Sequence, residues 1–335
     1  MDLFATGFNA WDQLSFSQKI PRDTTLQGED EDEDEPHDLD GFTKVLSAAD
    51  IERPVSRLSY TIVRQDGRLT VAGLGPPAED LEMLYSSAEA ASGELLTIVR
   101  GQDGNGANEL AKYPSLSSWA SGSAPEAVFR CSPPATQIAA FSAGFVILHL
   151  DGTVSTCGDP RFEACLGRDT STPTWPSGKP GPVPDLHDIV SADDPVKRVT
   201  AGGTAVAALT SSSGSVYVWG STPSASSKSP SSSHARRRGH AFQELSGIPN
   251  YTEIDNGKDV VDVALGEAHA IALTADGLIY VIGENHNGQL GLGRRAGVGR
   301  AETWINLPFR AAEGCKIVGV AAGPRASFIL TAKII

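Results

Sequence analysis

The stretch Val260–Gly293 is the clearest unit of an internal repeat, and this repetition constrains the fold more than any other feature of the chain. Three short runs rich in apolar, β-forming residues are separated by turns at Gly266 and at Asp276-Gly277. An Asp-Gly pair suits a tight hairpin because glycine readily adopts the positive φ that such a turn requires. The unit therefore predicts three antiparallel strands followed by a polar loop.

Related units recur along the chain, and their third strands end at Gly7, Gly73, Gly158, Gly220 and Gly283. The chain begins inside such a unit, whereas the segment Ile317–Thr331 holds only the first half of one. The two halves complete one blade if the chain closes into a ring, and closure removes exposed sheet edges. We therefore predict an all-β fold, a single β-propeller domain over residues 1–335. Five blades are counted and up to seven are possible, with the N- and C-terminal strands paired in one blade.

Three stretches depart from the repeat. Residues 76–127 lengthen one unit and are either an eroded blade or an insertion. Residues 15–40 contain an acidic run, and we expect a loop there because adjacent like charges repel and bury nothing. Residues 221–240 are rich in serine and arginine and are typical of a surface loop.

Composition narrows the class of protein. The formal net charge is −14, but nine of the acids lie in Glu29–Asp40, so the rest of the chain is neither strongly acidic nor basic and no nucleic-acid partner is expected. The four cysteines show no metal-site or redox spacing, and the chain has no signal-peptide pattern and no apolar run of about 18 residues. We expect a protein of the cytoplasm, the nucleus or both, neither secreted nor in a membrane.

The clearest unit resembles the repeat of the regulator of chromosome condensation family. The residues that carry the resemblance are Ala264, Gly266, His269, Leu273, Thr274, Asp276, Gly277, Tyr280, Gly283, Asn285, Gly288, Gln289, Leu290 and Gly291. The resemblance implies a β-propeller, for which the family's usual number of blades is seven, and a small member that carries little besides the propeller.

His269 stands at the histidine position of that repeat. The other units carry Gly144, Ala205 and Ala326 there, so no ring of histidines lines a pore. We interpret His269 as an internal brace whose ring nitrogens hydrogen-bond neighbouring backbone, because buried polar groups are normally bonded. It is not predicted to be a general base.

The polar tails of two units match each other. Asn285 and Gln289 in one tail correspond to Asn9 and Gln13 in the other, and we interpret all four as amides that lock tight loops. The glycines of the repeat are interpreted as turn and close-approach positions, namely Gly7, Gly266, Gly277 and Gly283.

Motifs of catalysis are absent from the sequence. A glycine-rich stretch at residues 101–106 lacks the GK[ST] ending of a phosphate loop, and no GxSxG or HExxH occurs. The sequence therefore predicts no enzyme, with no catalytic residue, no cofactor and no metal site.

Two charged clusters are candidate partner-binding residues, although a solvated loop is the simpler interpretation of each. One is acidic and one is basic: Glu29, Asp30, Glu31, Asp32, Glu33, Asp34 and Glu35, and then Arg236, Arg237 and Arg238. We predict a monomeric, non-catalytic protein-binding scaffold or regulatory subunit that acts through loops on the propeller faces.

The resemblance implies protein partners of several kinds: a small GTPase, a chromatin-associated protein, a tubulin-related factor, or a factor of tRNA or diphthamide modification. The alternative function that it implies is guanine nucleotide exchange on a Ran-type GTPase. In the family that activity is associated with a wedge-like β insertion, for which residues 76–127 are the only candidate here.

Overall fold

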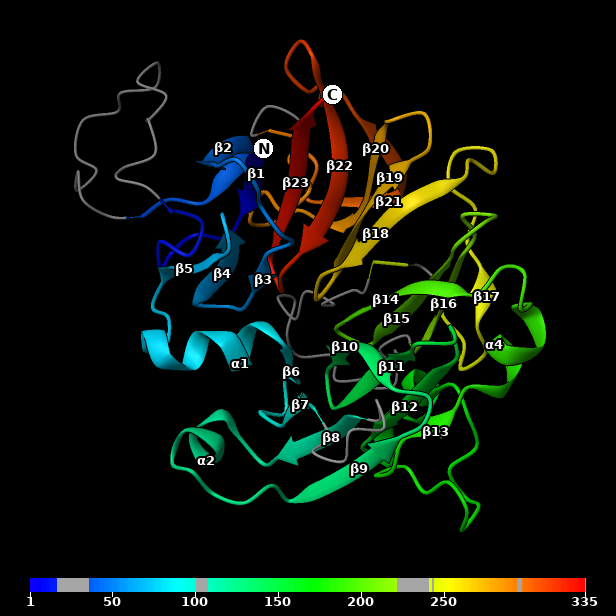
Figure 1. Cartoon of the computed structure of the whole chain (residues 1–335). Coiled ribbons are helices and arrows are strands. Elements are labelled where there is room, and N and C mark those ends of the chain that lie inside the picture. Colours follow the sequence, from blue (N-terminus) through cyan, green and yellow to red (C-terminus); the bar gives the residue numbers. More distant parts are fainter. Residues whose placement is uncertain (17–35, 101–107, 222–240, 243, 294–296, 335) are drawn as a thin grey trace, which may run out of the picture.

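The computed structural model describes residues 1–16, 36–100, 108–221, 241–242, 244–293 and 297–334. Their strands form six sheets around one axis, and the strands β3, β6, β10, β14, β18 and β22 face the centre (Figure 1). The predicted all-β propeller is confirmed. Its six blades are one more than the five units counted in the sequence and lie within the upper limit of seven.

Blade 1 closes the ring by joining the two ends of the chain, as predicted. Strand β1 pairs antiparallel with β23 along its whole length, from Asp2 opposite Thr331 to Gly7 opposite Ala326. The strand order of this blade is β2 (Leu39–Ser47), β1 (Asp2–Gly7), β23 (Ala326–Lys333) and β22 (Cys315–Ala322).

The other blades follow in chain order as antiparallel meanders. Blade 2 comprises β3 (Val55–Ser56), β4 (Tyr60–Gln65) and β5 (Arg68–Gly73). Blade 3 comprises β6 (Ser87–Glu89), β7 (Leu95–Arg100), β8 (Asn108–Tyr113) and β9 (Ala127–Cys131). Blade 4 comprises β10 (Ala135–Phe141), β11 (Gly144–His149), β12 (Val154–Gly158) and β13 (Gly181–Pro182).

Blade 5 comprises β14 (Val196–Gly202), β15 (Ala205–Thr210), β16 (Val216–Gly220) and β17 (Asn250–Tyr251). Blade 6 comprises β18 (Val260–Leu265), β19 (His269–Thr274), β20 (Ile279–Glu284) and β21 (Arg300–Leu307). Short helices lie in the connections: η1 (Ala78–Asp80), α1 (Leu81–Tyr85), α2 (Leu116–Ala120), η2 (Pro160–Phe162), α3 (Glu163–Leu166) and α4 (Pro184–Ile189). None of the helices in the described part of the chain is long and apolar enough to cross a membrane.

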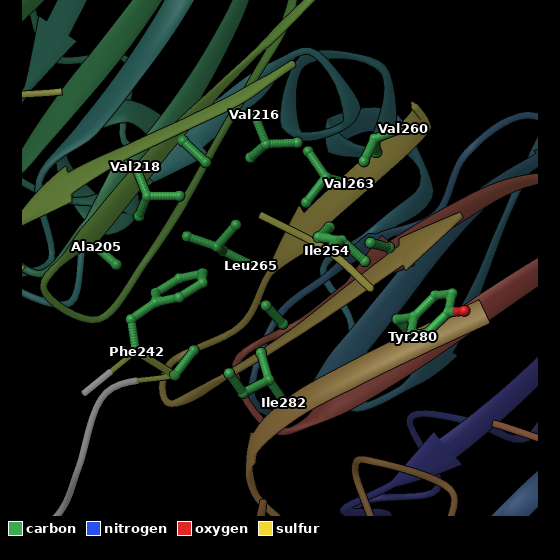
Figure 2. Packing of buried hydrophobic residues seen from close by; sticks show 14 of the residues in the cluster. Ala205, Val216, Val218, Phe242, Ile254, Val260, Val263, Leu265, Tyr280 and Ile282 are labelled. Carbon is green, nitrogen blue, oxygen red and sulfur yellow. The ribbon is translucent and has the colours of Figure 1, made fainter. Parts of the chain in front are cut away.

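The apolar core lies between neighbouring blades. Figure 2 shows Val216 and Val218 of β16 facing Val263 and Leu265 of β18, with Phe242 beside them. These side chains are buried, and removing their apolar surface from water stabilises the contact by roughly 25 cal/mol per Å². The blades are therefore held together by packing in addition to closure of the ring.

The structure describes most of one divergent stretch and little of the other two. Residues 76–127 contain η1, α1 and α2, and they supply most of the four-stranded sheet of blade 3. Residues 17–35 and 222–240, which hold most of the acidic stretch and nearly all of the Ser/Arg-rich stretch, lie outside the described residues.

Candidate binding site at the propeller axis

The two polar tails form the same loop in blades 6 and 1. The Asn285 side-chain oxygen accepts a hydrogen bond from the Leu290 N–H at 2.9 Å, and the Asn9 side-chain oxygen accepts one from the Leu14 N–H at the same distance. Each amide thus bridges five residues of its own loop. This geometry is what a loop-locking amide requires.

The glutamines act in the same two loops. The side-chain oxygens of Gln289 and Gln13 each accept a hydrogen bond at 2.9 Å, from Asn287 N–H and Trp11 N–H respectively. The Gln13 amide also donates to the Leu58 carbonyl at 3.0 Å and so ties its loop to blade 2. These contacts hold the two loops in place.

Asp38, near the end of the acidic stretch, joins the two locked loops. Its Oδ1 accepts from the Asn9 N–H at 2.9 Å, and its Oδ2 accepts from the Asn287 amide at 2.8 Å. The predicted partner-binding residues Glu29–Glu35 and Arg236–Arg238 lie outside the described residues.

The repeat glycines stand where a side chain has no room or a turn reverses. Gly7 and Gly283 have φ of 116° and 104°, and a Cβ on either would collide with the backbone of the neighbouring strand. A Cβ on Gly266 would collide with the ring of His269. Gly277, with φ of 80°, occupies the hairpin turn between β19 and β20.

His269 is completely buried, and its environment differs from the one expected. Its ring faces the backbone of Ala326 in blade 1, but neither ring nitrogen hydrogen-bonds any described residue. Burial lowers the pKa of His269 to about 4, so the imidazole is neutral near pH 7. Gly266 leaves the space that this ring fills. The side chain therefore acts mainly by filling volume between blades 6 and 1.

A shared irregularity in the innermost strands creates the polar site that sequence reasoning missed. The register of β10, β14, β18 and β22 shifts immediately before Gln137, Arg198, Asp262 and Gly319. A bulge redirects a side chain. The same position in four successive blades is thereby turned toward the neighbouring blade at the axis.

Three of these residues clamp the backbone of the following blade. The Gln137 side chain accepts from the Val199 N–H at 3.1 Å and donates to the Val199 carbonyl at 2.9 Å. Arg198 Nε donates to the Val263 carbonyl at 3.0 Å. Asp262 Oδ2 accepts from the Val320 N–H at 2.8 Å. The clamps link blade 4 to 5, 5 to 6 and 6 to 1.

Arg53, which precedes β3, completes the series from blade 2. Its Nη1 donates to the Val320 carbonyl, and its Nη2 lies 2.6 Å from Asp262 Oδ2. Gly319 has no side chain at the equivalent position, and a Cβ there would lie 3.1 Å from Asp262 Oδ2 and 3.7 Å from Arg53 Nη2. The absent side chain leaves the space through which Arg53 reaches Asp262.

One buried carboxylate is thus shared by two guanidinium groups. Only 6% of the Asp262 side chain is exposed, and its Oδ1 lies 3.1 Å from Arg198 Nε. The pKa of Arg198 is lowered to about 10, mainly by burial; Asp262 opposes this shift and Arg53 adds to it. Two guanidinium groups face one carboxylate, so the cluster carries an excess of positive charge.

A cavity of about 240 Å³ opens beside this cluster. It is lined by Arg53, Lys197, Arg198, Val261, Asp262 and Val318. Neither terminal nitrogen of Arg198 hydrogen-bonds a described residue, so these donors are available to a ligand. Val261 and Val318 are 44% and 38% exposed and give the cavity apolar walls. We call this cavity and its lining residues the axial mouth.

A second cavity, of about 260 Å³, lies beside the locked loop of blade 6. Its side-chain chemistry comes from Asp40, Asn285 and His286, and the other lining residues are Val298 and four glycines. The axial mouth is the better candidate because charged side chains from three blades converge there. A polar residue at the same place in three units, namely Gln137, Arg198 and Asp262, was the available sequence signal, but its identity changes from blade to blade.

Comparison with known proteins identifies the repeat. The model of the "Regulator of chromosome condensation (RCC1) repeat" matches residues 260–289, and a second model of the same description matches residues 276–330. Human E3 ubiquitin-protein ligase HERC2 is 29% identical over 247 residues, which are 73% of this chain and 4% of HERC2. The human Regulator of chromosome condensation is 31% identical over 232 residues, which are 64% of this chain and 45% of that protein.

The chain thus spans less than half the length of either relative. Among solved structures, Prp20p from Saccharomyces cerevisiae, described together with its binding properties to Gsp1p and histones, aligns with a TM-score of 0.62. The alignment covers 100% of this chain and 92% of Prp20p at 13% identity, which supports the same fold.

Proposed function

The chain carries regulator of chromosome condensation repeats, and from this premise we propose that it is a non-catalytic protein-binding scaffold whose axial mouth binds an acidic segment of a partner protein. The observation that carries the proposal is the charge of the mouth: Arg53, Lys197 and Arg198 surround the single carboxylate of Asp262. A carboxylate from a partner would meet the unbonded terminal nitrogens of Arg198, which suit bidentate pairing. The exposed valines would contact aliphatic parts of the same segment.

Saturation of Asp262 argues against acid-base chemistry at the axis. Its two oxygens accept from the Val263 and Val320 N–H groups and from Arg53, and Oδ1 forms an ion pair with Arg198. Both oxygens are thus already engaged by the protein's own donors. The lining residues include no nucleophile beside a base.

Nucleotide exchange on a Ran-type GTPase is the competing function. Residues 76–127 were the only candidate for an exchange wedge, and strands β7 and β8 lie wholly within them, in the sheet of blade 3. Their apolar residues Leu96 and Leu110 are fully buried in the propeller core. This use of the segment favours a scaffold over an exchange factor. Accelerated nucleotide release from a loaded Ran-type GTPase, at catalytic amounts of this protein, would overturn the non-catalytic part of the proposal.

Reversing the charge of Lys197 is expected to weaken partner binding by about tenfold, because a like charge would face the incoming acid. Lys197 is exposed and makes no ion pair with a described residue, so Lys197→Glu should fold normally. The matched control is Lys179→Glu, the same charge change on an exposed lysine that does not line the axial mouth. Tagged proteins would be compared by quantitative affinity purification and mass spectrometry. Equal recovery of every partner by both variants would contradict the proposed site.

A further inference from the structure

Blade 2 has three strands in the described chain, whereas each of the other five blades has four. Its outer strand is β5 (Arg68–Gly73), which among the described strands pairs only with β4. In blades 4, 5 and 6 a fourth strand follows the corresponding third strand. The outer edge of β5 is therefore the place where this propeller lacks a strand that its other blades possess.

The strand pairings identify which backbone groups of β5 point outward. In β4, the backbone carbonyls of Tyr60 and Arg64 point toward the inner side of the blade. The Tyr60 carbonyl accepts from the Arg57 N–H, and the Arg64 carbonyl accepts from the Glu52 N–H. Bonding directions alternate along an antiparallel strand. The hydrogen bonds between β4 and β5 are therefore exchanged by three residue pairs: Thr61 with Ala72, Val63 with Thr70, and Gln65 with Arg68. The N–H and C=O groups of Leu69 and Val71 point away from the sheet.

Exposure of β5 agrees with an uncovered edge. The third strands of blades 4, 5 and 6, which are β12, β16 and β20, are almost completely buried. In β5, Leu69, Thr70 and Val71 are half-buried, and Arg68 and Gly73 are exposed. No strand, turn or side chain of the described residues bonds the outward groups of Leu69 or Val71.

Helix α1 follows β5 in the chain but covers a different surface. Its buried residues Leu81 and Leu84 pack in one apolar cluster with Ile62, Leu69 and Val71. Ile62 and Val71 are direct partners in the sheet, so their side chains lie on one face. The helix thus closes a face of blade 2 and leaves the hydrogen-bonding edge of β5 free.

Exposed apolar side chains surround one end of this edge. Leu74, directly after β5, is 64% exposed, and Leu58 and Trp11 are each 47% exposed. The backbones of Leu58 and Trp11 converge on Gln13, whose amide bonds the Leu58 carbonyl and the Trp11 N–H. At the other end of the strand, Arg68 is exposed and makes no ion pair with a described residue.

We propose that β5 accepts an extended segment of a partner protein as the fourth strand of blade 2. The added strand would be antiparallel, as in every other pairing of this propeller, and would bond the outward N–H and C=O groups of Leu69 and Val71. Its amino-terminal half would be apolar, because it meets Leu74. Its carboxyl-terminal half would be acidic, because it meets Arg68. This surface is separate from the axial mouth.

The probe is a fluorescent synthetic peptide of about eight residues, valine- and leucine-rich in its first half and glutamate-rich in its second. Binding to the full chain is measured by fluorescence anisotropy. The control peptide has the same sequence with alternate backbone nitrogens methylated, which removes the N–H donors and keeps the side chains. We expect the methylated peptide to bind at least about tenfold more weakly, since two lost hydrogen bonds of about 1 kcal/mol each exceed a factor of ten.

A protein variant tests the same edge from the other side. Val71→Pro removes an outward N–H and leaves the bonds between β4 and β5 intact, and proline is tolerated at such an edge position. Its melting temperature verifies folding, and we expect it to bind the unmodified peptide about tenfold more weakly than the wild type. Lys197→Glu should bind the peptide as the wild type does, so failure at the axial mouth and failure here are distinguishable.

Three results would overturn the proposal. One is equal affinity for the methylated and unmodified peptides, which would mean that side chains alone drive binding. Another is the absence of binding to either peptide by the folded wild type. The third is a dimer in sedimentation analysis that Val71→Pro converts to a monomer, since the occupant of the edge would then be a second copy of the chain.

Discussion

Replacing Asp262 with asparagine is expected to lower the free energy of unfolding by about 3–5 kcal/mol, the usual effect of removing one partner from a buried ion pair. The asparagine keeps the shape of the side chain but removes its charge. Arg53 and Arg198 then face each other across the axis without a carboxylate between them. The two carboxylate oxygens of Asp262 accept separate hydrogen bonds from the Val263 and Val320 N–H groups. An asparagine has only one side-chain oxygen, so one of these two hydrogen bonds is lost.

Two further variants make this test specific. Glu82→Gln removes the partner of Arg64 in an ion pair whose Glu82 side chain is 74% exposed, and a change below about 1 kcal/mol is expected there. The second variant is the double substitution Asp262→Asn with Arg198→Gln. It places at position 198 the glutamine that blade 4 carries at the equivalent Gln137, and it removes the unpaired positive charge of Arg198. We expect the double variant to recover about 1–2 kcal/mol. Urea unfolding followed by circular dichroism measures all three, and equal losses for Asp262→Asn and Glu82→Gln would contradict the axial ion cluster.

Acidification from pH 7 to pH 4 is expected to remove about 3 kcal/mol of stability through His269 alone. Burial lowers the pKa of His269 from 6.5 to about 4 in the folded protein. The unfolded chain therefore binds a proton at a higher pH than the folded protein does. This contribution is fully present above pH 6.5, falls as the pH drops toward 4, and is constant below that value.

The measurement is the pH dependence of urea unfolding for the wild type and for His269→Ala, which places at this position the residue found at Ala205 and Ala326. The variant loses packing at every pH, but the difference between the two unfolding curves should shrink by about 3 kcal/mol between pH 7 and pH 4. His187→Ala, at an exposed position in α4, is the control and should follow the wild type. A constant difference for His269→Ala would mean that the buried ring is protonated as easily as in the unfolded chain.

The fold was predictable from sequence because a few positions of each unit obey strict local chemistry. Gly7 and Gly283 each occupy a backbone position that excludes a side chain, and Asn9 and Asn285 each close the same loop. Such constraints leave the same letters at regular spacing. Ring closure followed directly, because the half-unit at one end matched the half-unit at the other.

Neither blade 3 nor the axial mouth is marked in the sequence by identical residues at regular spacing. The buried positions of blade 3 are filled by apolar residues such as Leu96 and Leu110, and a core accepts many combinations of similar volume. The axial cluster joins Arg53 to Asp262 and Val320, which are far apart in the chain, and its repeated position changes from amide to cation to anion. Chemical complementarity between different blades is visible only when the ring is assembled.

Pairing of β1 with β23 also sets the order in which the chain can fold. Strand β1 pairs with β2, the next described strand, but its other partner is synthesised more than 300 residues later. The entropy cost of closing a loop rises only slowly with its length, so the effect on stability is small. The folding rate falls, however, because the two strands are so distant in sequence. During translation β1 therefore presents one unpaired edge until β23 has left the ribosome. Chaperone dependence should peak in that interval, and it should end when β23 docks.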